Sequence, residues 1–120
     1  MEMLIGGKHV SSEDLVDVKN PYDGQTIDTI PIAHRQTAQL AIDAANDAKE
    51  SLTEMSAFKI SNKLFNAVRK LEEKREEFAH ILSLEVGKPI NEALVEVDRS
   101  IETLRLSAEE AKRIYGESVP

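Results

Sequence analysis

The chain has 120 residues, enough for one small domain, and 41% of them are hydrophobic, which suffices for a core. It contains no cysteine, so disulfides, thiolate metal sites and a cysteine nucleophile are excluded within these residues. The formal net charge of −7 disfavours nucleic acids and anionic membrane surfaces, and no apolar run approaches the ~20 residues of a membrane-spanning helix. We therefore expect a cytoplasmic protein with no nucleic-acid partner and no membrane partner.

The first third of the chain is predicted to form short strands. Four segments have the composition or alternation of strands: residues 3–5, 8–10, 15–18 and 26–30. Gly6 and Gly7 separate the first two segments and fit a two-residue hairpin turn, which needs positive φ at both positions. Pro21 and Gly24 indicate a turn before the last segment. A phosphate-binding loop is the alternative for Gly6-Gly7, but neither a helix start nor a Lys-Ser/Thr pair follows it.

From about residue 35 the chain is predicted to be helical, because apolar residues recur at spacings of three and four. The first stripe consists mainly of small residues: Ala38, Ala41, Ala45, Ala48 and Leu52, with Ile42 beside them. The second stripe contains Ile60, Leu64, Ala67, Val68 and Leu71, and it continues with Phe78, Ile81, Leu82 and Glu85. The third and most regular stripe contains Ile90, Leu94, Val97, Ile101, Leu104, Ala108, Ala111 and Tyr115. Three to four helices are therefore expected after the strands.

Local signals predict where these helices begin and end. Ser56 is predicted to cap the second helix, and Gly116 to end the last one. The charged run at residues 72–77 is interpreted as a solvated face or a bend. The segment Glu85 to Pro89 is predicted to be a corner in which Gly87 closes one helix in the left-handed conformation, Lys88 places positive charge beside the free carbonyls, and Pro89 suits the first turn of the next helix.

Few residues suggest chemistry by type and spacing alone. His9, His34 and His80 each lack a second ligand at metal spacing, so surface or capping roles are favoured. Glu92 and Glu96 lie one turn apart, which suits a divalent cation or acid–base catalysis but is also common on solvated helices. No nucleophile triad, phosphate loop or dinucleotide fingerprint is present. The residues alone predict an α+β chain without an active site.

The long third stripe admits two interpretations. It fits a helix that packs on a larger body, and it also fits half of a coiled coil or bundle. In the second case the protein is a non-enzymatic helical interaction module capped by a β-hairpin.

Several segments taken in order resemble a known family. They are the hairpin from Leu4 to Val10, Asn20-Pro21 with Gly24, the strand to Ile30, the Ala38 to Ala48 helix, Arg69 with Leu71, the Glu85 to Pro89 corner, Glu92-Ala93, Glu96-Val97 and Leu104-Arg105. Their order and spacing resemble the N-terminal part of the aldehyde dehydrogenase family, and most of all its archaeal lactaldehyde- or semialdehyde-type branch. The resemblance implies a β-strand arm at residues 1–33 and a helical segment at 34–120, which together form one incomplete domain of an aldehyde-dehydrogenase-like α/β fold.

The resemblance implies an oxidoreductase that oxidises a small aldehyde to a carboxylate with NAD or NADP. In the family a cysteine thiolate attacks the aldehyde and a glutamate activates water. Because this chain has no cysteine, the nucleophile is expected beyond Pro120, and the 120 residues are expected to be inactive and to bind no cofactor. The expected partners are the rest of the polypeptide and further copies in a homo-oligomer.

Two groups of site residues follow from the resemblance. Val95, Glu96 and Arg99 match positions at the substrate entrance, with Ser100 or Thr103 nearby, and the alternative for Arg99 is a solvent-exposed helix residue. In some members of the family a structural monovalent cation is bound, and the positions of that site match Val18, Lys19 and Glu85. Here Val18 stands where well-known members have a hydroxyl residue, Lys19 brings its own positive charge, and the alternative for Glu85 is that it only ends a helix.

Overall fold

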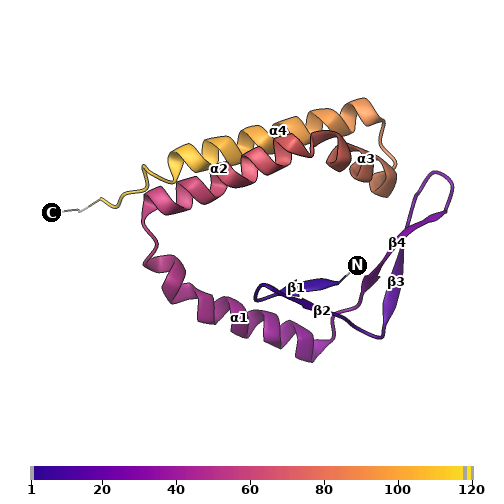
Figure 1. Ribbon diagram of the computed structural model, residues 1–120, viewed down its shortest axis with the longest axis horizontal. Helices are drawn as coiled ribbons and strands as arrows, with labels where there is room; N and C mark the ends of the chain where they lie inside the picture. Colours follow the sequence, from indigo (N-terminus) through magenta and orange to yellow (C-terminus); the bar gives the residue numbers. More distant parts are fainter. Residues whose placement is uncertain (1, 118, 120) are drawn as a thin grey trace. The chain divides into compact units, whose positions relative to one another are not determined.

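The computed structural model describes residues 2–117 and residue 119 (Figure 1). Over these residues the elements, in chain order, are β1 (Met3–Ile5), β2 (Lys8–Val10), β3 (Leu15–Lys19), β4 (Thr26–Pro31), α1 (Arg35–Thr53), α2 (Ala57–Glu73), α3 (Arg75–Val86) and α4 (Ile90–Glu110). This order confirms the predicted α+β fold of short strands followed by helices. The chain divides into two compact units. One runs to Glu54 and includes Leu84–Gly87, and the other contains Met55–Ser83 and the chain from Lys88 onward.

Two antiparallel strand pairs form the beginning of the first unit. In the pair β1–β2, Met3 lies opposite Val10, and the turn between the strands has φ of 56° at Gly6 and 76° at Gly7, as predicted. In the pair β3–β4, Leu15 lies opposite Pro31 and Lys19 opposite Thr26, with a register shift between Val18 and Lys19. Gly24, in the turn between β3 and β4, has a φ of 73°, so both turns have the left-handed conformation that glycine favours.

Helix α1 packs on the first hairpin through small residues. A Cβ on Gly6 would lie 3.2 Å from the Cβ of Ala44, so the hairpin turn approaches the helix closely. A depression between β1 and α1 is lined by Leu4, Ile5, Gly6, Ala41, Ala44, Ala45 and Ala48. The predicted stripe is therefore confirmed in its middle, whereas Leu52 at its end is 56% exposed and no residue of α1 is buried.

The core of the second unit lies where α2, α3 and α4 meet, and α2 and α4 run side by side (Figure 1). Its buried residues are Val68, Ala79, Ala93, Val97 and Ile101, with Leu71, Leu82, Leu94 and Leu104 packed around them. The third predicted stripe thus finds its partner within the chain. Ser61, which the apolar pattern did not include, is also buried. Its hydroxyl donates a 2.6 Å hydrogen bond to the carbonyl of Ala108, which satisfies this polar group in the core.

Helix boundaries in this unit agree with some predictions and correct others. The Ser56 hydroxyl accepts a hydrogen bond from the Lys59 amide at 3.4 Å, which confirms the predicted N-cap. The predicted bend in the charged run is found at Lys74, between α2 and α3.

Two extensions of the apolar stripes were wrong. The break at Lys74 shifts the helical phase, so α3 buries Ala79 while Phe78 remains 47% exposed and Ile81 43% exposed. Helix α4 ends at Glu110, before Tyr115 and Gly116. Near this end, the Ala108 carbonyl of α4 accepts a hydrogen bond from Ser61, which lies close to the beginning of α2 at Ala57. In the described part of the chain, no helix combines the length and apolar character needed to cross a membrane.

Candidate functional site

The corner between α3 and α4 has the predicted conformation at Gly87, whereas Pro89 lies one position before the first helical turn that was predicted for it. Gly87 has a φ of 73°, the left-handed conformation that ends a helix. A Cβ on Gly87 would lie 2.7 Å from Cγ of Pro21, so the approach of the Asn20–Pro21 turn also requires glycine here. Pro89 has a φ of −57° and occupies the N-cap of α4, one position before the first helical residue. These constraints determine where α4 starts.

Lys88 does not act on the end of α3 as predicted. Its ammonium forms an ion pair with the carboxylate of Glu96, and its side chain is only 26% exposed. Its carbonyl accepts a 2.7 Å hydrogen bond from the Ser83 hydroxyl. A carboxylate attracts the ammonium more strongly than helix-end carbonyls do, because they carry only partial charges. Lys88 is therefore fixed through both its backbone and its side chain.

One exposed side of α4 collects polar and charged residues. Its lining residues are Lys88, Asn91, Glu92, Val95, Glu96, Arg99, Ser100, Thr103 and Leu104, which we call the polar face of α4. Their spacing of three and four residues places them on one side of the helix. Because α4 and the corner residue Lys88 supply all of them, this is an open helix face rather than an enclosed cavity.

The residues predicted for a substrate entrance all belong to the polar face. Val95 is 57% exposed, and the hydroxyls of Ser100 and Thr103 donate 2.9 Å hydrogen bonds to the carbonyls of Glu96 and Arg99. Within the described part of the chain, the guanidinium of Arg99 has no hydrogen bond and no ion pair. The structure thus brings these five residues together, and their role at an entrance stays a prediction.

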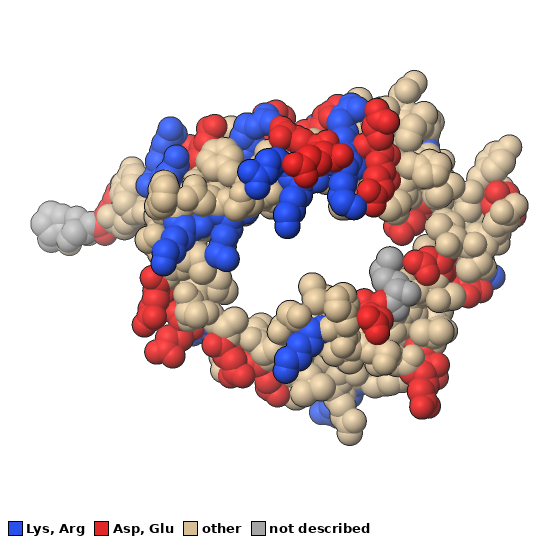
Figure 2. All heavy atoms as spheres, in the orientation of Figure 1, with Lys and Arg blue, Asp and Glu red and all other residues tan. Residues whose placement is uncertain are grey.

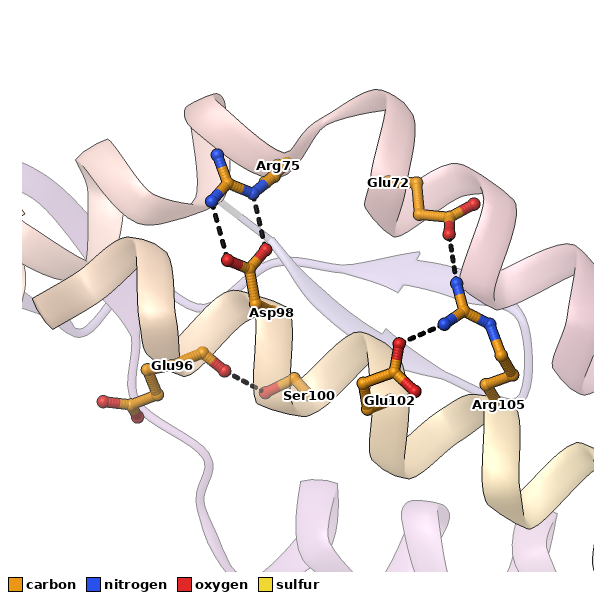
Figure 3. Close-up of polar contacts among 7 residues, drawn as sticks. All are labelled: Glu72, Arg75, Glu96, Asp98, Ser100, Glu102 and Arg105. Carbon is orange, nitrogen blue, oxygen red and sulfur yellow. Dashed lines mark hydrogen bonds and ion pairs between the residues drawn. The ribbon is translucent and has the colours of Figure 1, made fainter. Parts of the chain in front are cut away.

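Asp98, which the sequence did not single out, links α4 to α3 (Figure 3). Its carboxylate accepts hydrogen bonds from Nε and an Nη of Arg75 at 2.5 and 2.7 Å. These hydrogen bonds hold the pKa of Asp98 below its ordinary value and raise the pKa of Arg75. The pair is a bidentate contact of the strongest common type, and it orients α4 against α3.

Arg105 forms a second charged link, between α2 and α4. Its guanidinium pairs with Glu102 on its own helix and donates a 2.5 Å hydrogen bond to Glu72 of α2 (Figure 3). The hydrogen bond to Glu102 is the main cause that raises the pKa of Arg105. Figure 2 shows basic and acidic side chains interspersed over these helices, which agrees with such pairing.

The residues predicted for a monovalent cation all belong to the first unit. Val18 is half-buried on β3 at the register shift, whereas Lys19 and Glu85 are exposed. A shifted register leaves backbone carbonyls outside the regular ladder, and Glu85 adds one carboxylate. Carbonyl and carboxylate oxygens suit a hard cation, whereas Lys19 brings a positive charge of its own. Cation binding here stays a prediction.

The histidines and the Glu92/Glu96 pair show no metal site. His34 pairs with Asp14 at 2.8 Å and His9 with Glu2 at 3.5 Å, which agrees with surface roles. Glu96 is engaged by Lys88 instead of sharing a cation with Glu92. No group of three or more His, Cys, Asp or Glu side chains in the described part of the chain is arranged to hold a metal ion.

Comparison with known proteins identifies the family. The model of the aldehyde dehydrogenase family matches residues 9–120. The chain belongs to the aldehyde dehydrogenase family. It is 42% identical over 118 residues to a lactaldehyde dehydrogenase from Methanocaldococcus jannaschii, a match that covers 98% of this chain and 25% of that protein.

Two solved dehydrogenase structures show the same fold. One, from Physcomitrella patens, is in complex with the reaction product succinate. It has a TM-score of 0.92 and 37% identity, and the match covers 99% of this chain and 25% of that chain. The other is a glyceraldehyde-3-phosphate dehydrogenase from Methanocaldococcus jannaschii complexed with NADP, with a TM-score of 0.82 and 42% identity over 87% of this chain and 23% of that chain. The four described helices and two strand pairs match the N-terminal part of the aldehyde dehydrogenase fold. The chain spans about a quarter of the length of these relatives.

Proposed function

We propose that this chain is part of an NAD(P)-dependent enzyme that oxidises a small aldehyde, of the lactaldehyde or semialdehyde type, to a carboxylate. The observation that carries the proposal is the family match over residues 9–120. The 42% identity to a lactaldehyde dehydrogenase supports a hydroxylated aldehyde, and the succinate bound to a structural neighbour supports a carboxylated one. Both are small and polar, so the proposal specifies this substrate class.

The chain is proposed to carry none of the reacting groups. Aldehyde oxidation in this family depends on a cysteine thiolate, and the 120 residues contain no cysteine. The nucleophile must therefore come from other residues of the same enzyme. The chain by itself is proposed to be inactive, and its role is to support the catalytic part.

In the part of the chain that the structure describes, the Gly6-Gly7 turn does not fit a nicotinamide dinucleotide. A dinucleotide-binding turn leads into a helix whose N-terminus faces the pyrophosphate, whereas the Gly6-Gly7 turn leads into β2. NAD or NADP is therefore assigned to the rest of the enzyme. We propose that residues 1–33 and 34–120 together form one incomplete domain. The proposed partners of this domain are the rest of the polypeptide and further copies of the enzyme in a homo-oligomer.

We place the polar face of α4 at the substrate entrance, with Arg99 as the group that attracts a hydroxylated or carboxylated aldehyde. Replacing Arg99 by Ala in the enzyme that contains this chain should raise KM for such an aldehyde and leave kcat nearly unchanged, because only substrate capture is weakened. Steady-state kinetics measure both constants. An unchanged KM would remove Arg99 from the entrance.

A substrate panel tests the proposed function. The enzyme that contains this chain is assayed for reduced nicotinamide with lactaldehyde, succinic semialdehyde and an unsubstituted alkyl aldehyde of similar length, each with NAD and with NADP. We expect the highest kcat/KM for one of the two polar aldehydes. Equal or better turnover of the alkyl aldehyde would contradict the proposed substrate class, and no turnover of any aldehyde would contradict the reaction.

The proposed cation at Val18, Lys19 and Glu85 has its own test. Melting temperatures of the enzyme in potassium, sodium and choline chloride at equal ionic strength should differ if a monovalent cation is held there, and Glu85→Gln should remove the difference. Equal melting temperatures in the three salts would mean that Glu85 only ends α3.

A further inference from the structure

We infer that Lys88 is a positioning residue that keeps Arg99 available to an anionic aldehyde by holding Glu96 away from it. The inference rests on the proposed function, because it requires Arg99 to meet substrate. The feature that supports it is a contrast between Arg99, which has no partner in the described part of the chain, and the three carboxylates nearest to it in sequence, which each have one.

The neighbours of Arg99 on α4 include two carboxylates at the spacing of intrahelical ion pairs. Glu96 lies three residues before Arg99 and Glu102 three residues after it, and such pairs ordinarily form on helix surfaces. In the structure both carboxylates are occupied by other cations, Glu96 by Lys88 and Glu102 by Arg105. The adjacent Asp98 is occupied by Arg75 (Figure 3). Arg99 is therefore unpaired although three acidic side chains lie close to it in sequence.

Glu92 is the remaining carboxylate of the polar face. It precedes Arg99 by seven residues, two helical turns, which places it roughly 10 Å away along the axis. This separation is too large for a direct ion pair with Arg99. Glu96 is thus the acidic residue of the polar face whose position decides whether Arg99 is free.

Lys88 is well placed to hold Glu96 because its own position is fixed. The left-handed Gly87 precedes it, Pro89 follows it, and the Ser83 hydroxyl binds its carbonyl at 2.7 Å. With a side chain only 26% exposed, Lys88 has few alternative conformations to lose when it pairs. Its ammonium therefore reaches Glu96 from the corner, outside the helix that carries both Glu96 and Arg99.

Charge on the polar face supports the same role. Lys88 and Arg99 carry two positive charges, and Glu92 and Glu96 carry two negative charges, so the four side chains sum to zero. Removing the charge of Lys88 leaves a net charge of −1 and frees Glu96 to pair with Arg99. Both changes weaken the attraction of an anionic substrate more than that of a neutral aldehyde, because a charge–charge attraction to Arg99 is stronger than a hydrogen bond from Arg99 to a hydroxyl.

The experiment uses the enzyme that contains this chain with the variant Lys88→Met, which keeps the length of the side chain. KM is measured for succinic semialdehyde, which is anionic, and for lactaldehyde, which is neutral. We expect KM for the anionic aldehyde to rise about two- to five-fold with kcat unchanged, because an exposed intrahelical pair competes only modestly with substrate. KM for lactaldehyde should rise distinctly less.

A double variant and a matched control make the test specific. The double variant Lys88→Met/Glu96→Gln lacks the competing carboxylate, and the charges at positions 88, 92, 96 and 99 again sum to zero. KM for the anionic aldehyde should therefore return to the wild-type value. Lys63→Met changes net charge equally at an exposed α2 position outside the polar face and should alter neither KM.

Failure of this inference differs from failure of the proposed function. If the enzyme oxidises aldehydes, three results would contradict the role of Lys88 but not the proposed function. They are a wild-type KM in Lys88→Met, an equal rise in KM for both aldehydes, and a KM that stays high in the double variant. An enzyme that oxidises no aldehyde would overturn the proposed function and this inference with it.

Discussion

At the scale of single residues, Gly87 combines two requirements that only glycine meets. Its φ of 73° is costly for residues with a side chain, and a Cβ would lie 2.7 Å from Pro21. Gly87→Ala should lower the free energy of unfolding by roughly 2–4 kcal/mol, of which about 1–2 kcal/mol comes from the backbone conformation. Urea unfolding of the enzyme that contains this chain, followed by circular dichroism, measures the change.

Gly24 is the matched control for that prediction. It has the same φ of 73°, but a Cβ there would have no atom within 4 Å. Gly24→Ala should therefore cost only the backbone part, about 1–2 kcal/mol. Equal losses in the two variants would mean that the approach of Pro21 to Gly87 does not contribute.

Residue-level features were predictable where a local rule decides them. Glycine conformations at Gly6, Gly7 and Gly87 and the Ser56 cap depend on a few neighbouring residues, and the structure confirms all four. The partner of Lys88 was not predictable in this way. Glu96 lies eight residues away across a corner, and no helix periodicity relates positions on two different helices.

At the scale of elements, the Arg75–Asp98 pair joins α3 to α4 and makes stability depend on pH. Hydrogen bonds from Arg75 lower the pKa of Asp98 in the folded protein, whereas an unfolded aspartate has a pKa of about 3.9. The folded chain therefore holds Asp98 ionised to lower pH than the unfolded chain does. The stabilisation is fully present above about pH 4–5 and is lost as pH falls through the folded pKa.

The variant Asp98→Asn tests this dependence. The difference in unfolding free energy between wild type and variant should be present at neutral pH and should shrink as the pH is lowered below about 4. Denaturant unfolding at a series of pH values measures it. Glu109→Gln, an exposed carboxylate of α4, should leave the pH profile unchanged. If the difference in unfolding free energy between wild type and Asp98→Asn stays constant down to acid pH, the Arg75–Asp98 pair is not the source of the pH dependence.

Element boundaries were predicted well where turn residues mark them and poorly where packing decides. The strands and the beginnings of α1 and α2 follow from periodicity and capping. The apolar stripe alone did not reveal that α3 buries Ala79 instead of Phe78, because the break at Lys74 resets the helical phase. It also predicted α4 to extend to Tyr115, although the helix ends at Glu110.

At the scale of the whole molecule, the buried core is small and unevenly distributed. Every buried apolar residue in the described part belongs to the second unit: Val68, Ala79, Ala93, Val97, Ile101, Ala108 and Ala111. Large apolar side chains remain exposed in both units, among them Leu4 at 69%, Phe58 at 66% and Leu106 at 59%. These surfaces are expected to be covered by the remainder of the enzyme.

The isolated chain should therefore self-associate or melt weakly. Exposed apolar surface favours association, and a chain without its packing partner loses cooperativity. Sedimentation and calorimetry of the 120-residue chain measure both properties. A monomer with a sharp, highly cooperative transition would contradict the expectation and would favour a self-sufficient helical interaction module.

The family assignment was predictable from the order of weak local signals, whereas the substrate was not. Hairpin, turn, corner and helices occur in the order that the family shows, and the family match extends over residues 9–120. Substrate choice depends on side chains that face one another across a site, and this chain is proposed to contribute only one open helix face to it.

The central claim is that this chain supports aldehyde oxidation without performing it. The most direct measurement compares formation of reduced nicotinamide from lactaldehyde and succinic semialdehyde by the 120-residue chain and by the longer enzyme that contains it. We predict no turnover by the chain and turnover by the longer enzyme, abolished by blocking its cysteine. Turnover by the chain itself, which has no cysteine, would contradict the account.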